Sequence, residues 1–399
     1  MKKYDYEVLN YIINQGYTSQ RAIAKATGYS LGKVNESVRM LIIKGYLKDD
    51  FTITEKSRRE IQKRKPKNAI ILAAGYGVRM VPINNEVPKG LLKVKGETLI
   101  ERLIKQLHNV GIYDIDIVVG FLMGKYEYLI DKYGVNLVHN TDYKLRDNLY
   151  SLNVVADKIS NTYIIPSDIW SRNNPFSTSE LYSWYSVIDA VDAESTVRIN
   201  RNKEPVHTKE GEEGNKMIGI SYLLEDEASR VRENLNRLSK MKRHKKSLWE
   251  ESLFDRNNKM FVFARVHKND EIFDINTYEE LRELDENSMN LDSKSIYLIA
   301  KKLGVEVDDI SKIAVLKKGM TNRSFVFTCK GKRYIMRIPG EGTDKLVNRE
   351  NEYHVYELIR NKNISDRVIY ISKDTGYKIT EFIENARPCN PNNESDVRL

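Results

Sequence analysis

Cysteine is scarce in this chain, which has only Cys329 and Cys389 among its 399 residues. They stand far apart and have no histidine partners at metal-ligand spacing, which excludes a disulfide-stapled scaffold and a zinc knuckle. No apolar run approaches the ~18 residues that span a bilayer, and residues 1–16 have no signal-like apolar core. These absences predict a cytoplasmic protein with no membrane partner.

Length and charge indicate a chain of several parts. At ~150 residues per domain the length allows two or three domains, and 41% hydrophobic with 30% charged residues is typical of a globular protein. Most of the formal charge of +9 lies in residues 1–67, where fifteen Lys and Arg stand against seven Asp and Glu. A polar stretch over 286–295 marks a second boundary. We therefore predict three parts: residues 1–64, 67–287 and 294–399.

The first part has helical periodicity three times within residues 1–45, with Ser19 and Ser30 as helix caps and a short hairpin after them. This order resembles a winged helix-turn-helix, and residues 62–67 look like a basic linker. The resemblance implies that residues 1–67 bind duplex DNA. Side chains of the third helix would reach bases and phosphates: Lys33, Asn35 and Arg39. A protein-interaction or dimerisation module is the alternative, since many winged helices bind no DNA.

The second part opens with a buried strand and a glycine loop. Residues 69–74 are apolar and lead directly into Gly75-Tyr76-Gly77-Val78-Arg79-Met80. The backbone N–H groups of such a loop bind phosphates, but Met80 replaces the third glycine of a dinucleotide-binding fingerprint. Strands and helices alternate after the loop, which predicts an α/β fold with a doubly wound mixed sheet.

An ordered run of motifs makes the resemblance specific. Leu-Ala-Ala-Gly-x-Gly-x-Arg-Met, then Pro-Lys-x-Leu, then Val-x-Gly-x-x-Leu-Ile resembles the signature of the nucleotidyltransferases that make NDP-sugars and CDP-alcohols. Asn84-Asn85 departs from this signature, in which threonine is usual near residue 84. The resemblance implies a Rossmann-like domain. It also implies a set of nucleotide-binding residues: Leu72, Ala73, Ala74, Gly75, Gly77 and Asn148.

The chemistry of such an enzyme needs charge stabilisation more than a nucleophile. A phosphomonoester attacks the α-phosphorus of a nucleoside triphosphate and pyrophosphate leaves, so negative charge accumulates on phosphoryl oxygens. We expect Arg79 and Lys89 to be the catalytic cations, and no general base is apparent. The resemblance implies that Asp168 and Asp274 hold Mg²⁺ between the phosphates.

Three segments are closer to the bacterial CTP:phosphocholine cytidylyltransferases than to the sugar-nucleotide branch: residues 147–152, 167–170 and 249–251. CTP and phosphocholine would then be the substrates. The quaternary ammonium of choline needs aromatic faces or a carboxylate. Candidate pocket residues are Trp170, Tyr182, Trp184, Tyr222, Trp249 and Glu250.

Other interpretations stay open for this part. The aromatic residues could be ordinary core, the enzyme could be a sugar-1-phosphate nucleotidyltransferase, or a DNA-binding regulator could use the domain as a sensor. The basic run at 240–246 is more typical of a solvated helix end than of a pyrophosphate or nucleic-acid site.

The third part changes character. Strands around a Gly-Met-Thr-Asn turn resemble the N-lobe of bacterial choline kinases of the aminoglycoside-phosphotransferase-like group. The resemblance implies ATP as a further partner. Its site residues would be Thr321, Asn322, Arg337 and Glu352. After the hinge-like residues 381–383 only sixteen residues follow, without catalytic-loop acids, so we expect an incomplete lobe and no choline kinase activity.

Overall fold

The structure is a computed structural model that forms two compact units, each described here by itself. It describes residues 1–201, 203–209, 211–254, 260–318, 322–340, 343, 347–360, 362, 364–386 and 390–397. The first unit comprises Met1–Tyr76, Pro88–Leu92 and Glu97–Ile275. The second comprises Gly77–Val87, Lys93–Gly96 and Asn276–Leu399. Within the described part, no helix is both long and apolar enough to cross a membrane.

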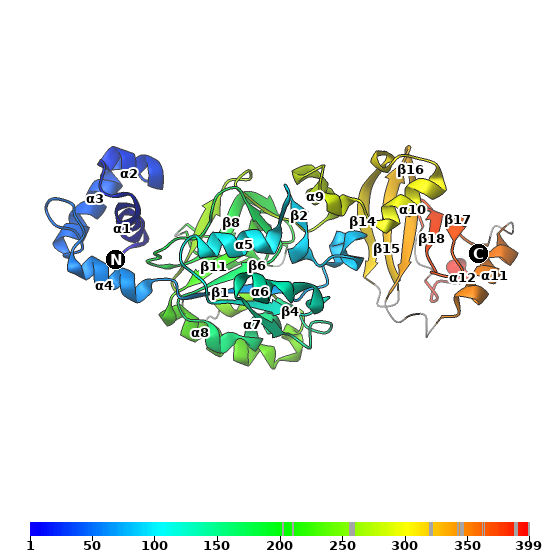
Figure 1. The fold of residues 1–399 in the computed structure, drawn as a ribbon, viewed down its shortest axis with the longest axis horizontal. Coiled ribbons are helices and arrows are strands. Elements are labelled where there is room, and N and C mark those ends of the chain that lie inside the picture. Colours follow the sequence, from blue (N-terminus) through cyan, green and yellow to red (C-terminus); the bar gives the residue numbers. More distant parts are fainter. Residues whose placement is uncertain are drawn as a thin grey trace. The chain divides into compact units, whose positions relative to one another are not determined.

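The first unit begins with the helices drawn in blue in Figure 1: α1 (Lys3–Gln15), α2 (Gln20–Thr27), α3 (Leu31–Ile43) and α4 (Glu55–Arg64). The predicted caps are confirmed, because Ser19 and Ser30 each accept a hydrogen bond from a backbone N–H in the first turn of α2 and α3. The predicted hairpin is reduced to one bridge between Leu47 and Ile53. The prediction of a linker at 62–67 is wrong at its start, because α4 continues to Arg64.

A seven-stranded mixed sheet follows, in the order β12-β8-β11-β6-β1-β4-β5. Strands β6, β1, β4 and β5 are parallel, whereas β11 runs antiparallel to β6 and β8. The strands are β1 (Asn68–Ala73), β4 (Ile115–Val119), β5 (Asn136–His139), β6 (Thr162–Pro166), β8 (Ser183–Asp192), β11 (Gly214–Leu223) and β12 (Val262–His267). The predicted Rossmann-like α/β domain with a mixed sheet is confirmed.

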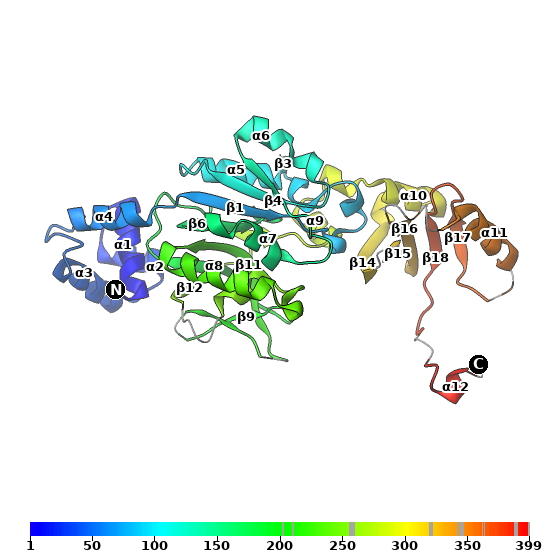
Figure 2. The ribbon, with the colours of Figure 1, turned by 90° about the horizontal axis from the view of Figure 1, so that it is seen from below.

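Helices cover both faces of this sheet, with α5 on one side and α7 and α8 on the other (Figures 1 and 2). Successive residues of β1 point to opposite faces, so Ile71 packs in the α5 core and Ile70 in the α7–α8 core. The helices are α5 (Leu99–His108), α6 (Tyr128–Tyr133), α7 (Asn148–Val154) and α8 (Glu225–Ser239). Short strands complete the unit: β3 (Glu97–Thr98), β7 (Ile169–Ser171), β9 (Val197–Ile199), β10 (Pro205–His207) and β13 (Ile272–Asp274).

The N-terminal helices share the hydrophobic core of the α5 face instead of standing apart from the sheet. The hydroxyl of Tyr182 donates to Glu7 at 3.0 Å, and the hydroxyl of Tyr222 donates to the carbonyl of Arg64 at 2.6 Å. A guanidinium N–H of Arg64 donates in turn to the carbonyl of Leu181 at 2.6 Å. Aromatic residues of the sheet and residues of α1 and α4 therefore form a single packed interface.

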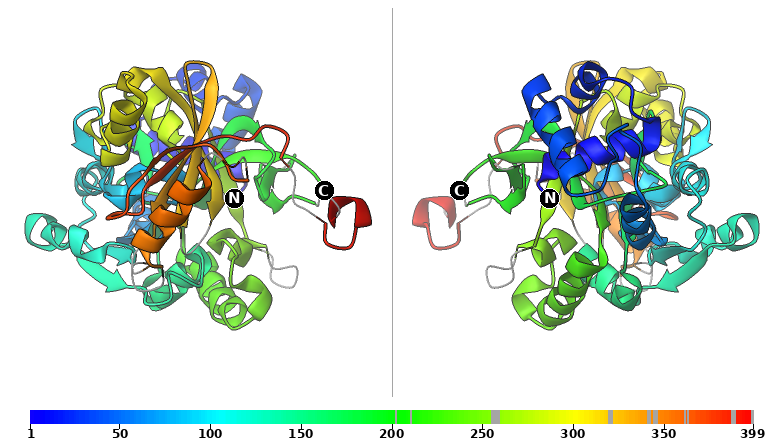
Figure 3. Two further views of the ribbon diagram at one scale, coloured as in Figure 1. Left: turned by 90° about the vertical axis from the view of Figure 1, so that its right-hand side faces the viewer. Right: turned by 90° about the vertical axis from the view of Figure 1, so that its left-hand side faces the viewer.

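The second unit holds a five-stranded antiparallel sheet in the order β14-β15-β16-β18-β17 (Figure 3, left, orange and red). The strands of this sheet are β14 (Ile310–Lys318), β15 (Asn322–Cys329), β16 (Lys332–Pro339), β17 (Val368–Ile371) and β18 (Lys378–Glu381). The unit also contains the short strand β2 (Lys93–Val94). Its helices are α9 (Tyr278–Leu284), α10 (Lys294–Leu303), α11 (Arg349–Ile359) and α12 (Glu394–Val397). Cys389 lies outside the described residues.

Candidate active site

The carboxyl end of β1 lies between two neighbouring strands and is tied to the segments that leave both of them. The carbonyl of Leu72 accepts from the backbone N–H of Ser167, beyond β6, at 3.1 Å. The carbonyl of Ala74 accepts from Phe121, beyond β4, at 3.1 Å. Chain segments diverge to opposite sides at this point, which is where open α/β sheets bind ligands. Leu72 and Ala73 are buried, while Gly75 has open space where a Cβ would stand.

Lys89 and Asp168 meet next to this edge. The Nζ of Lys89 lies 2.7 Å from Oδ2 of Asp168, and the side chains are 15% and 19% exposed. Gly90 allows the short 3-10 helix Lys89–Leu91 to approach, because a Cβ there would lie 3.0 Å from the side chain of Ser167 and 3.2 Å from the hydroxyl of Tyr126. The pair therefore sits in a tightly packed, half-enclosed environment.

Asp168 and Asp274 are brought together by a short antiparallel pairing of β7 and β13. Ile169 lies opposite Asp274, and the backbone N–H of Ile275 donates to the carbonyl of Asp168 at 3.0 Å. Lys216, on β11, lies 3.1 Å from Oδ1 of Asp274. Sequence reasoning missed Lys216, and a cation inside a strand with no other charged residue is the signal that could have found it.

The donor set at this position fits Mg²⁺. No cluster of three or more His, Cys, Asp and Glu that could hold a metal occurs among the described residues. Mg²⁺ nevertheless is usually bound by one or two carboxylates together with water and substrate phosphates. Two carboxylates, Asp168 in the turn before β7 and Asp274 at the end of β13, satisfy that requirement.

The remaining predicted loop residues lie in the second unit. Gly77 has a φ of 58°, in the left-handed region that glycine adopts without strain. It precedes the 3-10 turn Val78–Met80, from which the guanidinium of Arg79 donates to Oδ1 of Asn276 at 2.9 Å. Both partners of that hydrogen bond belong to the same unit.

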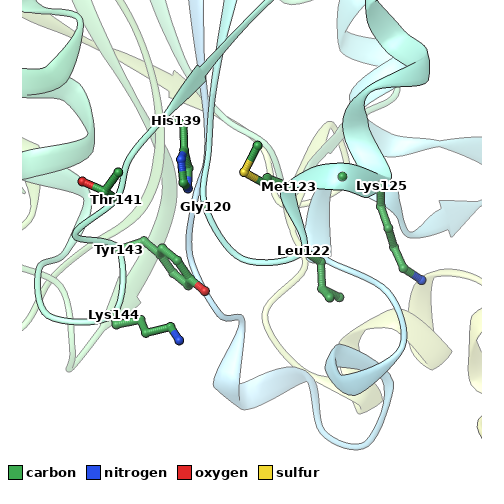
Figure 4. A pocket seen from close by; sticks show the side chains of 9 residues that line it. Gly120, Leu122, Met123, Lys125, His139, Thr141, Tyr143 and Lys144 are labelled. Atoms are coloured by element: carbon green, nitrogen blue, oxygen red, sulfur yellow. The ribbon is translucent and has the colours of Figure 1, made fainter. Parts of the chain in front are cut away.

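A cavity of about 560 Å³ opens at the carboxyl ends of β4 and β5 (Figure 4). Its lining residues are Gly120, Leu122, Met123, Gly124, Lys125, His139, Thr141, Tyr143 and Lys144. The ring of Tyr76, from the glycine loop, lies 4.8 Å from Phe121 and 5.2 Å from Tyr143, centroid to centroid. Sequence reasoning proposed none of the lining residues for a site, because Val119 and His139 at the two strand ends become neighbours only through the pairing of β4 with β5.

Asn148 links this side of the sheet to the segment before β12. Its Oδ1 accepts from the backbone N–H of Trp249 at 2.8 Å, so it holds the turn that carries Glu250. Glu250 is 4% exposed, and its carboxyl accepts a hydrogen bond from the hydroxyl of Tyr185 at 2.8 Å. Burial raises the pKa of Glu250 to about 7. Gly219, on β11, lies beside this carboxyl, since a Cβ there would be 3.7 Å from its Oε1.

The six predicted choline-pocket residues do not gather at one place. Trp249 is fully buried in the α7–α8 core, near Glu250. On the other face, Trp184 lies 3.6 Å below the guanidinium of Arg265 and belongs with Tyr182 and Tyr222 to the core beside the N-terminal helices. The structure therefore does not bring these three residues together with Trp249 and Glu250, because the two groups lie on opposite faces of the sheet.

Trp170 has a third environment within the first unit. Its ring contacts the guanidinium of Arg102 at 5.2 Å and lies 5.8 Å from the ring of Phe273. Because Phe273 is next to Asp274 in β13, Trp170 lies on the short pairing that carries the two carboxylates.

The predicted DNA-contacting side chains of α3 differ in whether they contact another side chain of the N-terminal helices or are exposed to solvent. Lys33 places its Nζ 4.0 Å from the ring centroid of Tyr4, a cation–π contact within the N-terminal helices. Asn35 and Arg39 are exposed on α3. Glu36 is exposed on the same helix, and its carboxylate would oppose a phosphate backbone.

The predicted ATP-site residues lie in the second unit, except that Thr321 is outside the described residues. Asn322 begins β15. The guanidinium of Arg337 forms two hydrogen bonds with Glu352, one of them 3.0 Å long, and Arg349 reaches the same carboxylate at 3.1 Å. A cation on β16 therefore pairs with an acid on α11.

Comparisons with known proteins agree with this geometry. A family model described as "MobA-like NTP transferase domain" matches residues 69–170, and one described as "wHTH-PRTase associated" matches residues 8–75. The choline-phosphate cytidylyltransferase of Streptococcus pneumoniae is 29% identical over 221 residues, which are 55% of this chain and 96% of that protein. The 2-aminoethylphosphonate cytidylyltransferase of Lancefieldella rimae is 30% identical over 199 residues, 46% of this chain and 78% of that protein.

The fold supports the same relationship. The solved structure of CTP:phosphocholine cytidylyltransferase from Streptococcus pneumoniae matches with a TM-score of 0.51 and 28% identity, over 55% of this chain and 98% of that one. The strand β1 and the carboxylates Asp168 and Asp274 of the first unit lie within the region that these relatives cover or directly beside it. The chain belongs to the nucleotidyltransferase family that includes these choline-phosphate and 2-aminoethylphosphonate cytidylyltransferases.

Proposed function

We propose that this chain transfers the cytidylyl group of CTP to phosphocholine, giving CDP-choline and pyrophosphate. The observation that carries the proposal is the meeting of Lys89 with Asp168, beside Asp274, at the strand ends next to the glycine loop. The curated relatives supply the substrate class, since both of those named act in cytidylyl transfer.

In this reaction the chain's own residues act by charge and position. The phosphate of the acceptor is mostly dianionic at neutral pH and attacks the α-phosphorus directly, so no protein base removes a proton. Lys89 stabilises the charge that develops on the transferring phosphoryl group, and Lys216 is suited to orient the phosphate of the acceptor. Arg79 would neutralise the triphosphate. Mg²⁺ held by Asp168 and Asp274 would neutralise phosphate charge and orient the leaving pyrophosphate.

Nucleotide and acceptor would approach from different sides of β1 and β6. The cavity at Gly120 and Thr141, next to Tyr76 of the loop, has the size and the aromatic wall for a nucleoside. The buried carboxyl of Glu250, beside Trp249, offers a negative charge to a cationic head group. Choline phosphate and 2-aminoethylphosphonate both carry a cationic nitrogen, whereas a sugar phosphate does not. This chemistry favours phosphocholine over the sugar-1-phosphate alternative.

The test is a pyrophosphate-release screen of the full chain with Mg²⁺. It crosses CTP, UTP, ATP and GTP with phosphocholine, phosphoethanolamine, 2-aminoethylphosphonate and glucose-1-phosphate. Highest kcat/KM for CTP with phosphocholine supports the proposal. Highest kcat/KM with glucose-1-phosphate would replace it by the sugar-nucleotide alternative, and tight nucleotide binding without turnover would favour a sensor.

Two further partners are proposed for the other parts, together with a cytoplasmic location that the scarcity of cysteine favours. Residues 1–67 would bind duplex DNA, supported by their charge surplus and by the exposure of Asn35 and Arg39. The full chain should then shift a DNA duplex at 50 mM salt and lose affinity steeply by 200 mM. The Arg337–Glu352 pair supports a kinase-like lobe that binds ATP, which calorimetry with ATP and an Arg337→Ala variant would test.

A further inference from the structure

The segment 239–247, between α8 and Trp249, is held against the loop that enters α7. A guanidinium N–H of Arg146 donates to the carbonyl of Ser239 at 2.8 Å. The backbone N–H of Asp147 donates to the carbonyl of Lys245 at 3.0 Å. Part of the segment is the 3-10 helix Lys242–His244. These hydrogen bonds tie the segment to the loop at both of its ends.

The segment is strongly and uniformly cationic. Residues 240–246 read Lys-Met-Lys-Arg-His-Lys-Lys and contain no acid. Burial, with the neighbouring Arg243 as a second cause, lowers the pKa of His244, which is therefore mainly neutral at pH 7. Five exposed cations remain, which we call the cationic collar: Lys240, Lys242, Arg243, Lys245 and Lys246.

The collar adjoins the nucleoside-sized cavity. The loop 141–147, to which it is tied, contributes Thr141, Tyr143 and Lys144 to the cavity wall. Lys144 is itself exposed and adds one cation to the cavity wall. The collar is thus hydrogen-bonded to the loop that contributes to the cavity wall, and its five cationic residues are exposed.

We propose that the cationic collar attracts the triphosphate of the incoming nucleotide and raises the rate at which it reaches the cavity. This inference rests on the proposed function, since it assigns a nucleotide to the cavity. Charge of one sign beside a cleft raises the local concentration of an oppositely charged substrate and speeds association by ~10–10³-fold. A nucleoside triphosphate is a polyanion, and it feels such charges within the Debye length of ~10 Å at 0.1 M salt.

A purely structural role predicts something different. Cations near the C-terminus of α8 stabilise the helix by ~0.3–1 kcal/mol each, but this effect is confined to the last turn. Lys240 is the residue that caps α8, and the other four cations lie beyond it. If the charges served only α8, their removal would lower the melting temperature and leave nucleotide association unchanged.

The experiment compares two variants of equal charge in the full chain. The collar variant carries Lys240→Gln, Lys242→Gln, Arg243→Gln, Lys245→Gln and Lys246→Gln. The matched control removes five exposed cations of the N-terminal part instead: Arg58→Gln, Arg59→Gln, Lys63→Gln, Lys65→Gln and Lys67→Gln. Both have the same net charge, so any difference between them reports on position. Stopped-flow binding of a fluorescent CTP analogue is measured from 20 to 500 mM salt without acceptor, and kcat and KM for CTP are measured in parallel.

We expect the collar variant to bind the analogue about 5–10-fold more slowly at 20 mM salt and to match the wild type at 500 mM. KM for CTP should rise without a change in kcat, and the control should behave as the wild type in both measurements. Equal association rates for collar variant and wild type would overturn the proposal, as would an equal loss in the control. If the wild-type chain binds the analogue but shows no turnover, the proposed reaction is wrong. Slower association of the collar variant would still support the collar in that case.

Discussion

Lys89 lies 2.7 Å from Asp168, and this ion pair spans 79 residues of sequence to join the 3-10 turn after Pro88 with the end of β6. The pair holds a cation where the transferring phosphoryl group would pass, next to the carboxylate that would hold Mg²⁺. Its preorganisation matters because groups fixed before the reaction need not reorganise when charge develops. The two residues are therefore expected to act as one unit in catalysis.

We predict that Lys89→Ala and Asp168→Ala each lower kcat by about 10²–10³, since each removes charge stabilisation from a phosphoryl-transfer site. The double variant should be much less impaired than the product of the two single losses, because residues in one network are not additive. Steady-state pyrophosphate release with saturating substrates measures all three variants. Circular dichroism provides the control for folding, and a single variant with kcat near that of the wild type would remove that residue from the mechanism.

A second prediction concerns the buried acid Glu250, whose pKa burial raises to about 7. If its carboxylate attracts a cationic acceptor, KM for phosphocholine should fall as pH rises from 6 to 8, when the group becomes charged. Glu250→Gln should weaken that pH dependence, leaving the part that comes from ionisation of the acceptor phosphate, and raise KM at pH 8, while KM for CTP stays near the wild-type value. A KM profile that is flat in the wild type, or unchanged in the variant, would argue that Glu250 is only a core residue.

The raised pKa of Glu250 also affects the stability of the folded protein, to which this group contributes less as pH rises. The folded protein holds the proton of Glu250 up to about pH 7, whereas the unfolded chain releases it near the ordinary value of 4.5. The folded state thus binds more protons between these values, so this group's contribution to stability falls as pH rises from 4.5 to 7. Glu250→Gln should therefore reduce the dependence of the melting temperature on pH across this window. Calorimetry between pH 5 and 8 measures this dependence.

Much of the first unit could be predicted from local patterns. The apolar run of β1, the serine caps of α2 and α3, and the motif around Lys89 each depend on neighbours in the sequence. The pairing of Asp168 with Asp274 was predictable through resemblance to a family, since 106 positions separate them. Their role with Mg²⁺ remains a prediction.

Long-range packing decided what local patterns could not. Trp184 and Tyr185 are consecutive in β8, so they face opposite sides of the sheet, and sequence alone does not say which side holds the substrate. Tyr182 is buried, and its hydroxyl donates a hydrogen bond to Glu7, which lies 175 residues earlier in the chain. The cavity at Gly120 and Thr141 likewise depends on the adjacency of β4 and β5.

A third prediction concerns the second unit, where Arg337 and Arg349 share the carboxylate of Glu352. Glu352→Ala should destabilise this unit by about 1.5–3 kcal/mol, because both guanidinium groups would lose a charged hydrogen-bond partner while largely buried. Glu352→Gln should cost less, since the amide oxygen still accepts. Urea unfolding followed by hydrogen exchange of β16 and α11 reports this unit, and equal stability of all three proteins would show that the pair contributes nothing.

The last prediction concerns deletion of residues 1–64. If these residues were an independent module, their removal would leave cytidylyl transfer untouched. The shared core indicates otherwise. Tyr182 and Tyr222 hydrogen-bond to Glu7 and Arg64 and lie in one core with residues of α1, so they lose that cover in the truncated chain. Uncovering one large aromatic side chain costs ~1.5–3 kcal/mol, and ~1 kcal/mol corresponds to ~2–4 °C in a domain of this size.

We therefore expect the truncated chain to melt at least ~5 °C lower than the full chain and to aggregate through the exposed aromatic surface. Two substitutions separate packing from other effects. Tyr182→Phe removes only the hydrogen bond to Glu7 and should cost about 0.5–1.5 kcal/mol. Lys25→Ala, on the exposed face of α2, should change stability by less than ~0.5 kcal/mol. Calorimetry of the full chain, the truncated chain and the two variants measures the order of their melting temperatures. A truncated chain as stable as the full chain would mean that the N-terminal helices dock without supporting the catalytic sheet.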